Sequence, residues 1–105
     1  MDIEVKILLN DRRTPAGKLA DAEIHFTSGE LAGLKLVGFA VWERRAGSGR
    51  GRSVTFPARQ FVVNGDRHNF SLLRGIHDAS AQNRVRELVL KAYEQQAQDR
   101  VYVSQ

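Results

Sequence analysis

The stretch from Leu34 to Arg52, LKLVGFAVWERRAGSGRGR, constrains the fold of this chain more than any other. Its first half predicts a strand with apolar side chains on both sides of the pleat: Leu36, Ala40 and Trp42 on one side, and Val37, Phe39 and Val41 on the other. A strand that is apolar on both faces needs cover on both. Because one helix covers only one face of a small sheet, we expect the other face to meet a second sheet or a second subunit.

The second half of this stretch is a loop rich in arginine and glycine, residues 44–52. It carries Arg44, Arg45, Arg50 and Arg52. Arginine presents a planar fork of donors that suits phosphate, and glycine lets a loop follow a phosphate backbone closely. We expect this loop to contact phosphates. The alternative is a solvated hairpin tip that binds nothing.

The positive charge is concentrated in the middle of the chain. Residues 44–86 contain nine arginines and two acidic residues, a net charge of +7, whereas the whole chain carries +4. Such a bias favours an anionic partner, most often nucleic acid, over a merely solvated surface. We therefore expect nucleic acid as the partner.

The 105 residues predict one domain with a modest core. There is no cysteine, no apolar run of roughly 18 residues and no basic-then-apolar leader, so we expect a cytoplasmic protein without disulfides or a membrane span.

Alternation predicts a first strand over residues 3–9, a second over 20–27 and the central strand from residue 31 or 34 to 43. Gly38, inside the central strand, indicates a bulge or a close backbone approach. A strand resumes at Val54, Phe56 and Ala58, and Pro57 makes it an edge strand or a bulged one. Asn64-Gly65 predicts a two-residue hairpin turn.

From Asp78 or Ser80 the apolar period becomes helical. The expected stripe holds Ala81, Val85, Leu88, Val89 and Ala92, with Tyr93 at its margin. Leu90 points away from the stripe, either as an exposed leucine or as part of a second contact. Strands followed by one helix predict an α+β fold: a small antiparallel meander sheet of about five strands with a C-terminal helix on one face.

Arg74, Arg84 and Arg86 near the helix start form a second candidate phosphate-binding patch, and ion pairing with Asp78 and Glu87 is the alternative. The phenylalanines could stack on bases, but their alternation places most of them in the core, with Trp42 as the best exception. His25, His68 and His77 follow no metal-ligand spacing, and no nucleophile or phosphate-loop motif occurs. We therefore expect no enzyme activity, cofactor, metal or small-molecule substrate.

Several motifs together resemble the stage V sporulation protein G (SpoVG) family of small bacterial proteins. These are GKLADAEIHF at 17–26, LAGLKLVGFAVWE at 31–43, SVTFPAR at 53–59 and QNRVRELVLKAY at 82–93. The loop 44–52 is longer and more basic than the family pattern, and the segment after Arg59 lacks the family's polar His-Pro stretch.

The resemblance implies one SpoVG-like domain over residues 1–105 and a dimeric DNA-binding transcription regulator, with RNA binding also possible. It also implies nucleic-acid contacts from the helix and neighbouring basic positions, here Arg59, Arg84, Arg86 and Lys91. Our expectation is a homodimer that binds nucleic acid through the loop and the helix start. The alternative is a non-enzymatic adaptor that binds an acidic protein.

Overall fold

The computed structural model describes residues 2–12, 14–44 and 51–103. It contains two antiparallel sheets and one helix, so the predicted α+β class is confirmed. Four strands, β1 (Ile3–Leu9), β2 (Lys18–Phe26), β3 (Lys35–Arg44) and β4 (Gly51–Thr55), form the main sheet in sequence order. Strands β5 (Ala58–Val63) and β6 (Asp66–Ser71) form a separate two-stranded hairpin, and the helix α1 spans Ser80–Val103.

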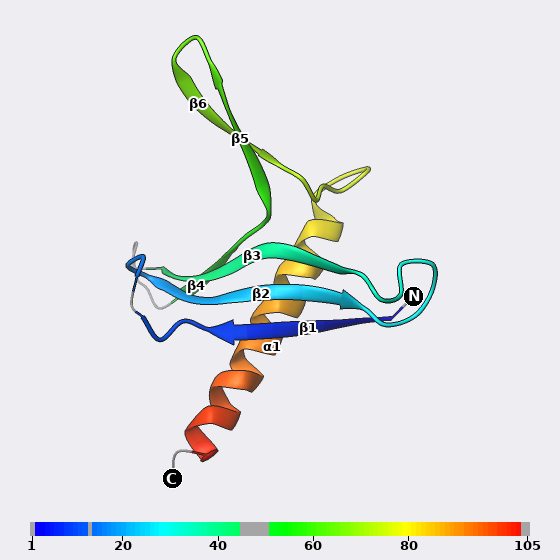
Figure 1. The fold of residues 1–105 in the computed structure, drawn as a ribbon, viewed down its shortest axis with the longest axis vertical. Coiled ribbons are helices and arrows are strands. Elements are labelled where there is room, and N and C mark those ends of the chain that lie inside the picture. Colours follow the sequence, from blue (N-terminus) through cyan, green and yellow to red (C-terminus); the bar gives the residue numbers. More distant parts are fainter. Residues whose placement is uncertain (1, 13, 45–50, 104–105) are drawn as a thin grey trace.

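The helix crosses one face of the four-stranded sheet and contacts β1, β3 and β4 (Figure 1). The core lies between them and is built from small and β-branched residues of the strands together with Phe39: Ala20, Ala22, Ile24, Val41 and Val54. From the helix, Val89 and Tyr93 are buried against this layer, and Val85, Leu90 and Ala97 pack around them. The contact stripe therefore follows a spacing of four residues, 85, 89, 93 and 97.

This stripe corrects two expectations for the helix. Tyr93 is a core residue, 9% exposed, and does not lie at the margin. Leu90 is half-buried against the core, whereas Leu88 is the exposed leucine. The reason is that residues four apart are slightly rotated about the helix axis, so the row 85, 89, 93 and 97 turns gradually around the helix. Its later members lie on the same side as position 90 and away from position 88.

The expected two-faced apolar strand is also corrected. The pairing of β2 with β3 shifts register between Ala22↔Phe39 and Ile24↔Leu36, so that one extra residue of β3 is accommodated at the Val37-Gly38 step. This bulge rephases the strand and puts Leu36, Phe39 and Val41 on the helix side together. Ala40 and Trp42 remain on the opposite face, and Val37, at the bulge, is 51% exposed. The bulge thus moves Leu36 to the helix side, and cover by a second subunit stays a prediction.

Gly38 confirms both expectations made for it. Its φ is +108°, and a Cβ built on it would lie 2.9 Å from the Cβ of Pro57. Pro57 is buried at the point where the chain leaves the main sheet. The expected continuous strand through Val54, Phe56 and Ala58 is consequently wrong, because β4 ends at Thr55 and β5 begins at Ala58 in another sheet.

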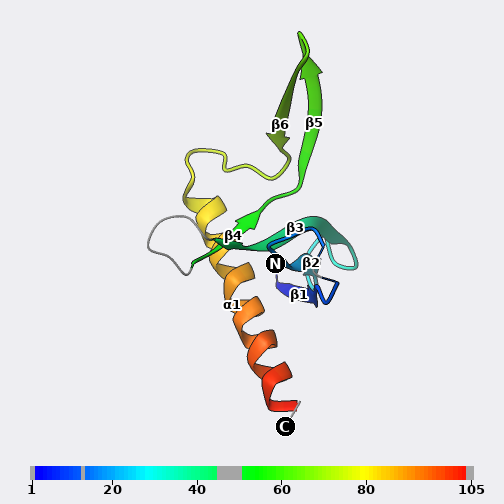
Figure 2. The ribbon, with the colours of Figure 1, turned by 90° about the vertical axis from the view of Figure 1, so that its left-hand side faces the viewer.

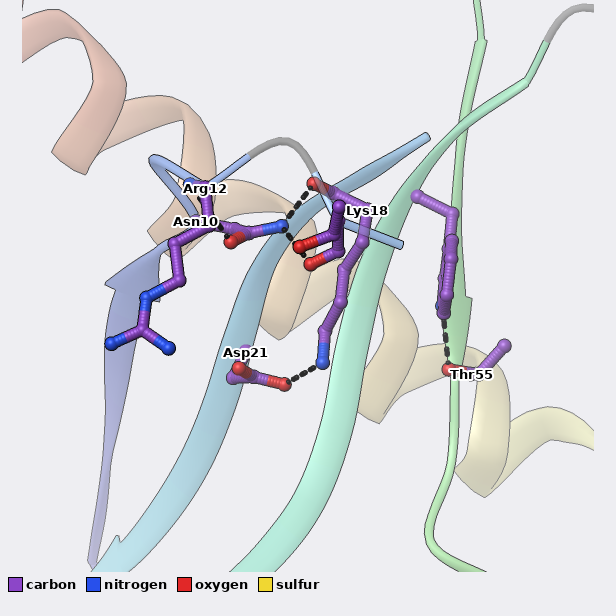
Figure 3. Close-up of polar contacts among 7 residues, drawn as sticks. Asn10, Arg12, Lys18, Asp21 and Thr55 are labelled. Atoms are coloured by element: carbon purple, nitrogen blue, oxygen red, sulfur yellow. Dashed lines mark hydrogen bonds and ion pairs between the residues drawn. The ribbon is translucent and has the colours of Figure 1, made fainter. Parts of the chain in front are cut away.

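Polar contacts fix the end of the main sheet that carries the first turn (Figure 3). The Asn10 side-chain amide donates to the carbonyl oxygens of Lys18, at 2.9 Å, and Thr14, at 3.3 Å, and so closes the turn between β1 and β2. On β3 the Trp42 indole N–H donates to the Thr55 hydroxyl at 2.9 Å, which ties the outer face of β3 to β4.

The β5–β6 hairpin projects away from the rest of the molecule in both views (Figures 1 and 2). Asn64 and Gly65 form its turn, with φ values of +52° and +84°, as their sequence predicts. Eleven of its twelve strand residues are exposed, and the twelfth, Ser71, is half-buried. Two-stranded hairpins have little stability of their own in water.

Candidate nucleic-acid interface

Of the four arginines of loop 44–52, Arg44 and Arg52 belong to the described part of the chain. Arg44 ends β3, and its backbone pairs with that of Gly51. Arg45 and Arg50 lie outside the described residues. Arg52 is on β4, where it contacts the helix: its guanidinium lies 5.0 Å from the centre of the Tyr93 ring and 3.6 Å from the carboxylate of Glu94. Arg52 therefore braces β4 against α1, although its side chain remains 44% exposed.

A second group of arginines meets at the base of the hairpin. On β5, Arg59 lies directly opposite Phe70 of β6 in the strand register. The guanidinium of Arg74, which follows β6, lies over the ring of this same Phe70, 4.4 Å from its centre. Phe70 thus has two arginines as neighbours, Arg59 through the strand pairing and Arg74 through contact with its ring.

Arg74 also joins this surface to the start of the helix. Arg74 and Arg84 line a pocket of about 370 Å³ together with residues of the connecting segment, and Ile76, His77 and Asp78 are among them. Gly75 packs so tightly against the Asp78 carbonyl that a Cβ there has no room. We refer to Arg59, Arg74 and Arg84 as the hairpin-base arginines.

Asp78 is the acidic residue within this pocket, and it is engaged by the helix start. Its carboxylate accepts hydrogen bonds from the Ser80 hydroxyl, at 2.6 Å, and from the Ser80 amide, at 2.9 Å. These bonds, and to a lesser degree the charge of Arg84, lower the pKa of Asp78. The ionised carboxylate of Asp78 offsets one of the two positive charges of Arg74 and Arg84, so the lining of the pocket keeps a net positive charge.

The remaining helical candidates lie in different surroundings. Arg86 is half-buried; its guanidinium donates to the Asn83 side chain at 2.6 Å and lies 5.2 Å from the centre of the Phe56 ring. The partner of Arg86 is thus neither of the acidic residues weighed in the sequence. Lys91 is exposed one to two turns further along the helix.

The aromatic residues divide differently from the sequence expectation. Phe39 is buried, and Phe26 and Phe56 pack against the core. Trp42, the expected exception, is half-buried and hydrogen-bonded. The exposed rings are instead Phe61, 41% exposed, and Phe70, 46% exposed, both on the hairpin. The Asn-Gly turn could have indicated that Arg59, Phe61 and Phe70 share one face, because a two-residue turn fixes the register. It does not indicate that this face is exposed.

The histidines also have separate roles. The ring of His68 stacks on that of Phe61 with centres 5.4 Å apart, and His77 lines the pocket. His25 Nε2 lies 2.9 Å from a Glu23 oxygen on the outer face of the main sheet. Within residues 2–12, 14–44 and 51–103, no three histidine or acidic side chains gather as metal ligands would. No helix in these ranges is long and apolar enough to cross a membrane.

Comparison with protein-family models, curated proteins and solved structures finds no match for this chain. The resemblance to the stage V sporulation protein G family stays a prediction from the sequence motifs.

Proposed function

We propose that this chain is a nucleic-acid-binding regulatory protein that acts as a homodimer and contacts phosphates through arginines at the hairpin base and helix start. The observation that carries the proposal is the grouping of Arg59, Arg74 and Arg84 around Phe70 and the adjoining pocket. Fixed guanidinium groups on an exposed surface match the spaced negative charges of a phosphate backbone.

The +7 block of residues 44–86 supports the same proposal from the sequence. The arginines of loop 44–52 adjoin β4 in the chain and are the candidates for further phosphate contacts. Arg52 contributes less in this account, because its guanidinium is already engaged by Glu94 and Tyr93.

The homodimer is supported by large apolar side chains that remain exposed away from the hairpin strands. Val37 is 51% exposed, Leu72 60% and Ile76 92%. A second copy is the partner that the family resemblance implies, and these side chains are the candidates for its interface. Sedimentation should therefore give twice the mass of one chain.

The test of phosphate contact is fluorescence anisotropy with labelled duplex DNA, single-stranded DNA and RNA. Replacing Arg74 and Arg84 by glutamine should weaken binding by at least about tenfold, since a hydrogen bond to a charged group contributes roughly 1.5–3 kcal/mol. The matched control is Arg12→Gln with Lys35→Gln, which removes the same charge from the main sheet and its first turn.

Equal losses in the two double variants would show that net charge alone governs binding and would contradict a site at the hairpin base. If the wild-type chain binds no nucleic acid and instead retains a protein partner after nuclease treatment, the adaptor alternative replaces this proposal.

A further inference from the structure

One face of the β5–β6 hairpin carries all of its aromatic rings, and the other carries none. The strand register places Arg59, Phe61 and Val63 of β5 on the same face as Asp66, His68 and Phe70 of β6. The opposite face carries Ala58, Gln60, Val62, Arg67, Asn69 and Ser71, none of them aromatic. We call the first of these the aromatic face of the hairpin.

The rings on this face are open to solvent yet held in place. Phe61 stacks on His68 with an angle of 22° between the rings, and Arg74 lies 4.4 Å from the centre of Phe70. Both phenylalanines nevertheless remain more than two-fifths exposed. Phe61 and Phe70 are diagonal neighbours across the two strands, a relation that separates positions by roughly 7–8 Å. Two neighbouring bases of an extended strand could each reach a ring at this separation.

We propose that the aromatic face binds single-stranded nucleic acid, with bases stacking on Phe61 and Phe70 and phosphates contacting Arg59 and Arg74. The proposal rests on the nucleic-acid-binding function above and specifies the form of nucleic acid bound. Proteins that bind single strands combine aromatic rings for the bases with a cationic track for the backbone, and other sheets stack two or three bases in this way.

The charge of the aromatic face favours nucleic acid over a second copy of this chain as its occupant. Arg59 and Arg74 flank the rings, and Asp66, at the turn end of the hairpin, is the one acidic residue among the six strand residues of this face. A polyanion would neutralise Arg59 and Arg74 together, whereas a second copy offers this face only one acidic strand residue, Asp66. Duplex DNA keeps its bases stacked on one another and offers no free base to the rings.

The experiment compares substitutions that separate stacking from apolar contact. Phe61→Leu with Phe70→Leu keeps apolar side chains but removes both rings, and Phe61→Tyr with Phe70→Tyr keeps the rings. The probes are oligo-dT and oligo-U of roughly ten nucleotides and a duplex of matched length. Ten nucleotides is within the length that one OB-fold domain covers when it binds a single strand. Val62→Ala on the opposite face is the control.

Wild-type protein should bind the single strands more tightly than the duplex. The ratio of its affinities for oligo-dT and oligo-U shows whether the preferred single strand is DNA or RNA. The leucine variant should lose about tenfold or more on single strands for the two rings together, with the duplex affinity unchanged. The tyrosine and Val62→Ala variants should stay within about threefold of wild type.

A measurement on the unaltered chain guards against a folding defect in the variants. The ring proton resonances of Phe61 and Phe70 should shift on titration with oligo-dT or oligo-U, and the ring protons of the buried Phe39 should not.

Three results would overturn the proposal. The leucine variant could bind single strands as wild type does, or the Phe61 and Phe70 rings could stay unshifted while the probe binds. The third is that Phe61→Ala with Phe70→Ala turns a dimer into a monomer by sedimentation, which would assign the aromatic face to a second copy. In each case, duplex binding that depends on Arg74 and Arg84 would leave the proposed nucleic-acid-binding function standing. If the wild-type protein binds none of the probes, single-stranded or duplex, both the aromatic-face proposal and the proposed function are wrong.

Discussion

Gly38 in β3 lies directly against Pro57, so that a Cβ on Gly38 would stand 2.9 Å from the Cβ of Pro57. This contact occurs where the bulge rephases β3 and where the chain leaves the main sheet for the hairpin. The direction in which the hairpin projects therefore depends on a position without a side chain.

Replacing Gly38 by alanine should lower the free energy of unfolding by about 1–3 kcal/mol, because the backbone has a φ of +108° and the new methyl group meets Pro57. Urea denaturation followed by the fluorescence of Trp42, the single tryptophan of the chain, measures the change. The matched control is Gly33→Ala, since Gly33 also has a positive φ, +90°, but has open space where its Cβ would be. A loss at Gly38 no larger than that at Gly33 would contradict a role for the contact with Pro57.

Arg52 and Glu94 should be coupled weakly but measurably. Their 3.6 Å ion pair is exposed, so a double-mutant cycle with Arg52→Ala and Glu94→Ala should give an interaction free energy of about 0.5 kcal/mol. Arg52→Ala alone should lose more than Glu94→Ala alone, since it also removes the guanidinium from the Tyr93 ring. Additive losses in the cycle would show that Arg52 is not held by Glu94 and is free to contact a partner.

The stability of the main sheet should depend on pH through Glu23. A hydrogen bond with His25, followed by one from Lys35, lowers the pKa of Glu23 below its ordinary value of 4.5. The unfolded chain therefore takes up a proton at a higher pH than the folded chain does. The stabilisation is complete above about pH 4.5 and is lost as the pH falls through the lowered pKa.

Glu23→Gln should consequently flatten the fall in the urea midpoint between about pH 5 and pH 2.5. The pKa values of Glu4 and Asp78 are also lowered, so some acid dependence should persist in the variant. A variant whose midpoint falls as steeply as that of wild type would exclude Glu23 as a source of the acid sensitivity.

The sequence predicts the regular elements of this chain well where local chemistry decides them. Alternation defines β1 and β2, and the Asn64-Gly65 turn defines the hairpin. The change of period places the helix start at Asp78 or Ser80, and the helix begins at Ser80. The bulge at Gly38 was expected, but its consequence for the phase of β3 was not, because the position of one extra residue depends on its pairing with β2.

The candidate site is less accessible to sequence reasoning, because it depends on which elements leave the main sheet. The pattern of side chains in residues 58–63 is the same whether this strand packs on a core or projects into solvent. The sequence therefore favours a buried position for Phe61 and Phe70, as for most of the phenylalanines. Their exposure follows from the break at Pro57, which directs the hairpin away from the helix-covered sheet. The convergence of Arg59 and Arg74 on Phe70 is a further consequence of that break.

The dependence of binding on salt tests the central claim most directly. For wild-type protein, the logarithm of the association constant should fall linearly with the logarithm of salt concentration, because phosphate contacts release counterions. The Arg74→Gln, Arg84→Gln variant should have a slope that is shallower by roughly 1.4 on single strands and 1.8 on duplex DNA, if each arginine contacts one phosphate. A wild-type slope near zero, or an unchanged slope in the variant, would contradict phosphate binding by the hairpin-base arginines.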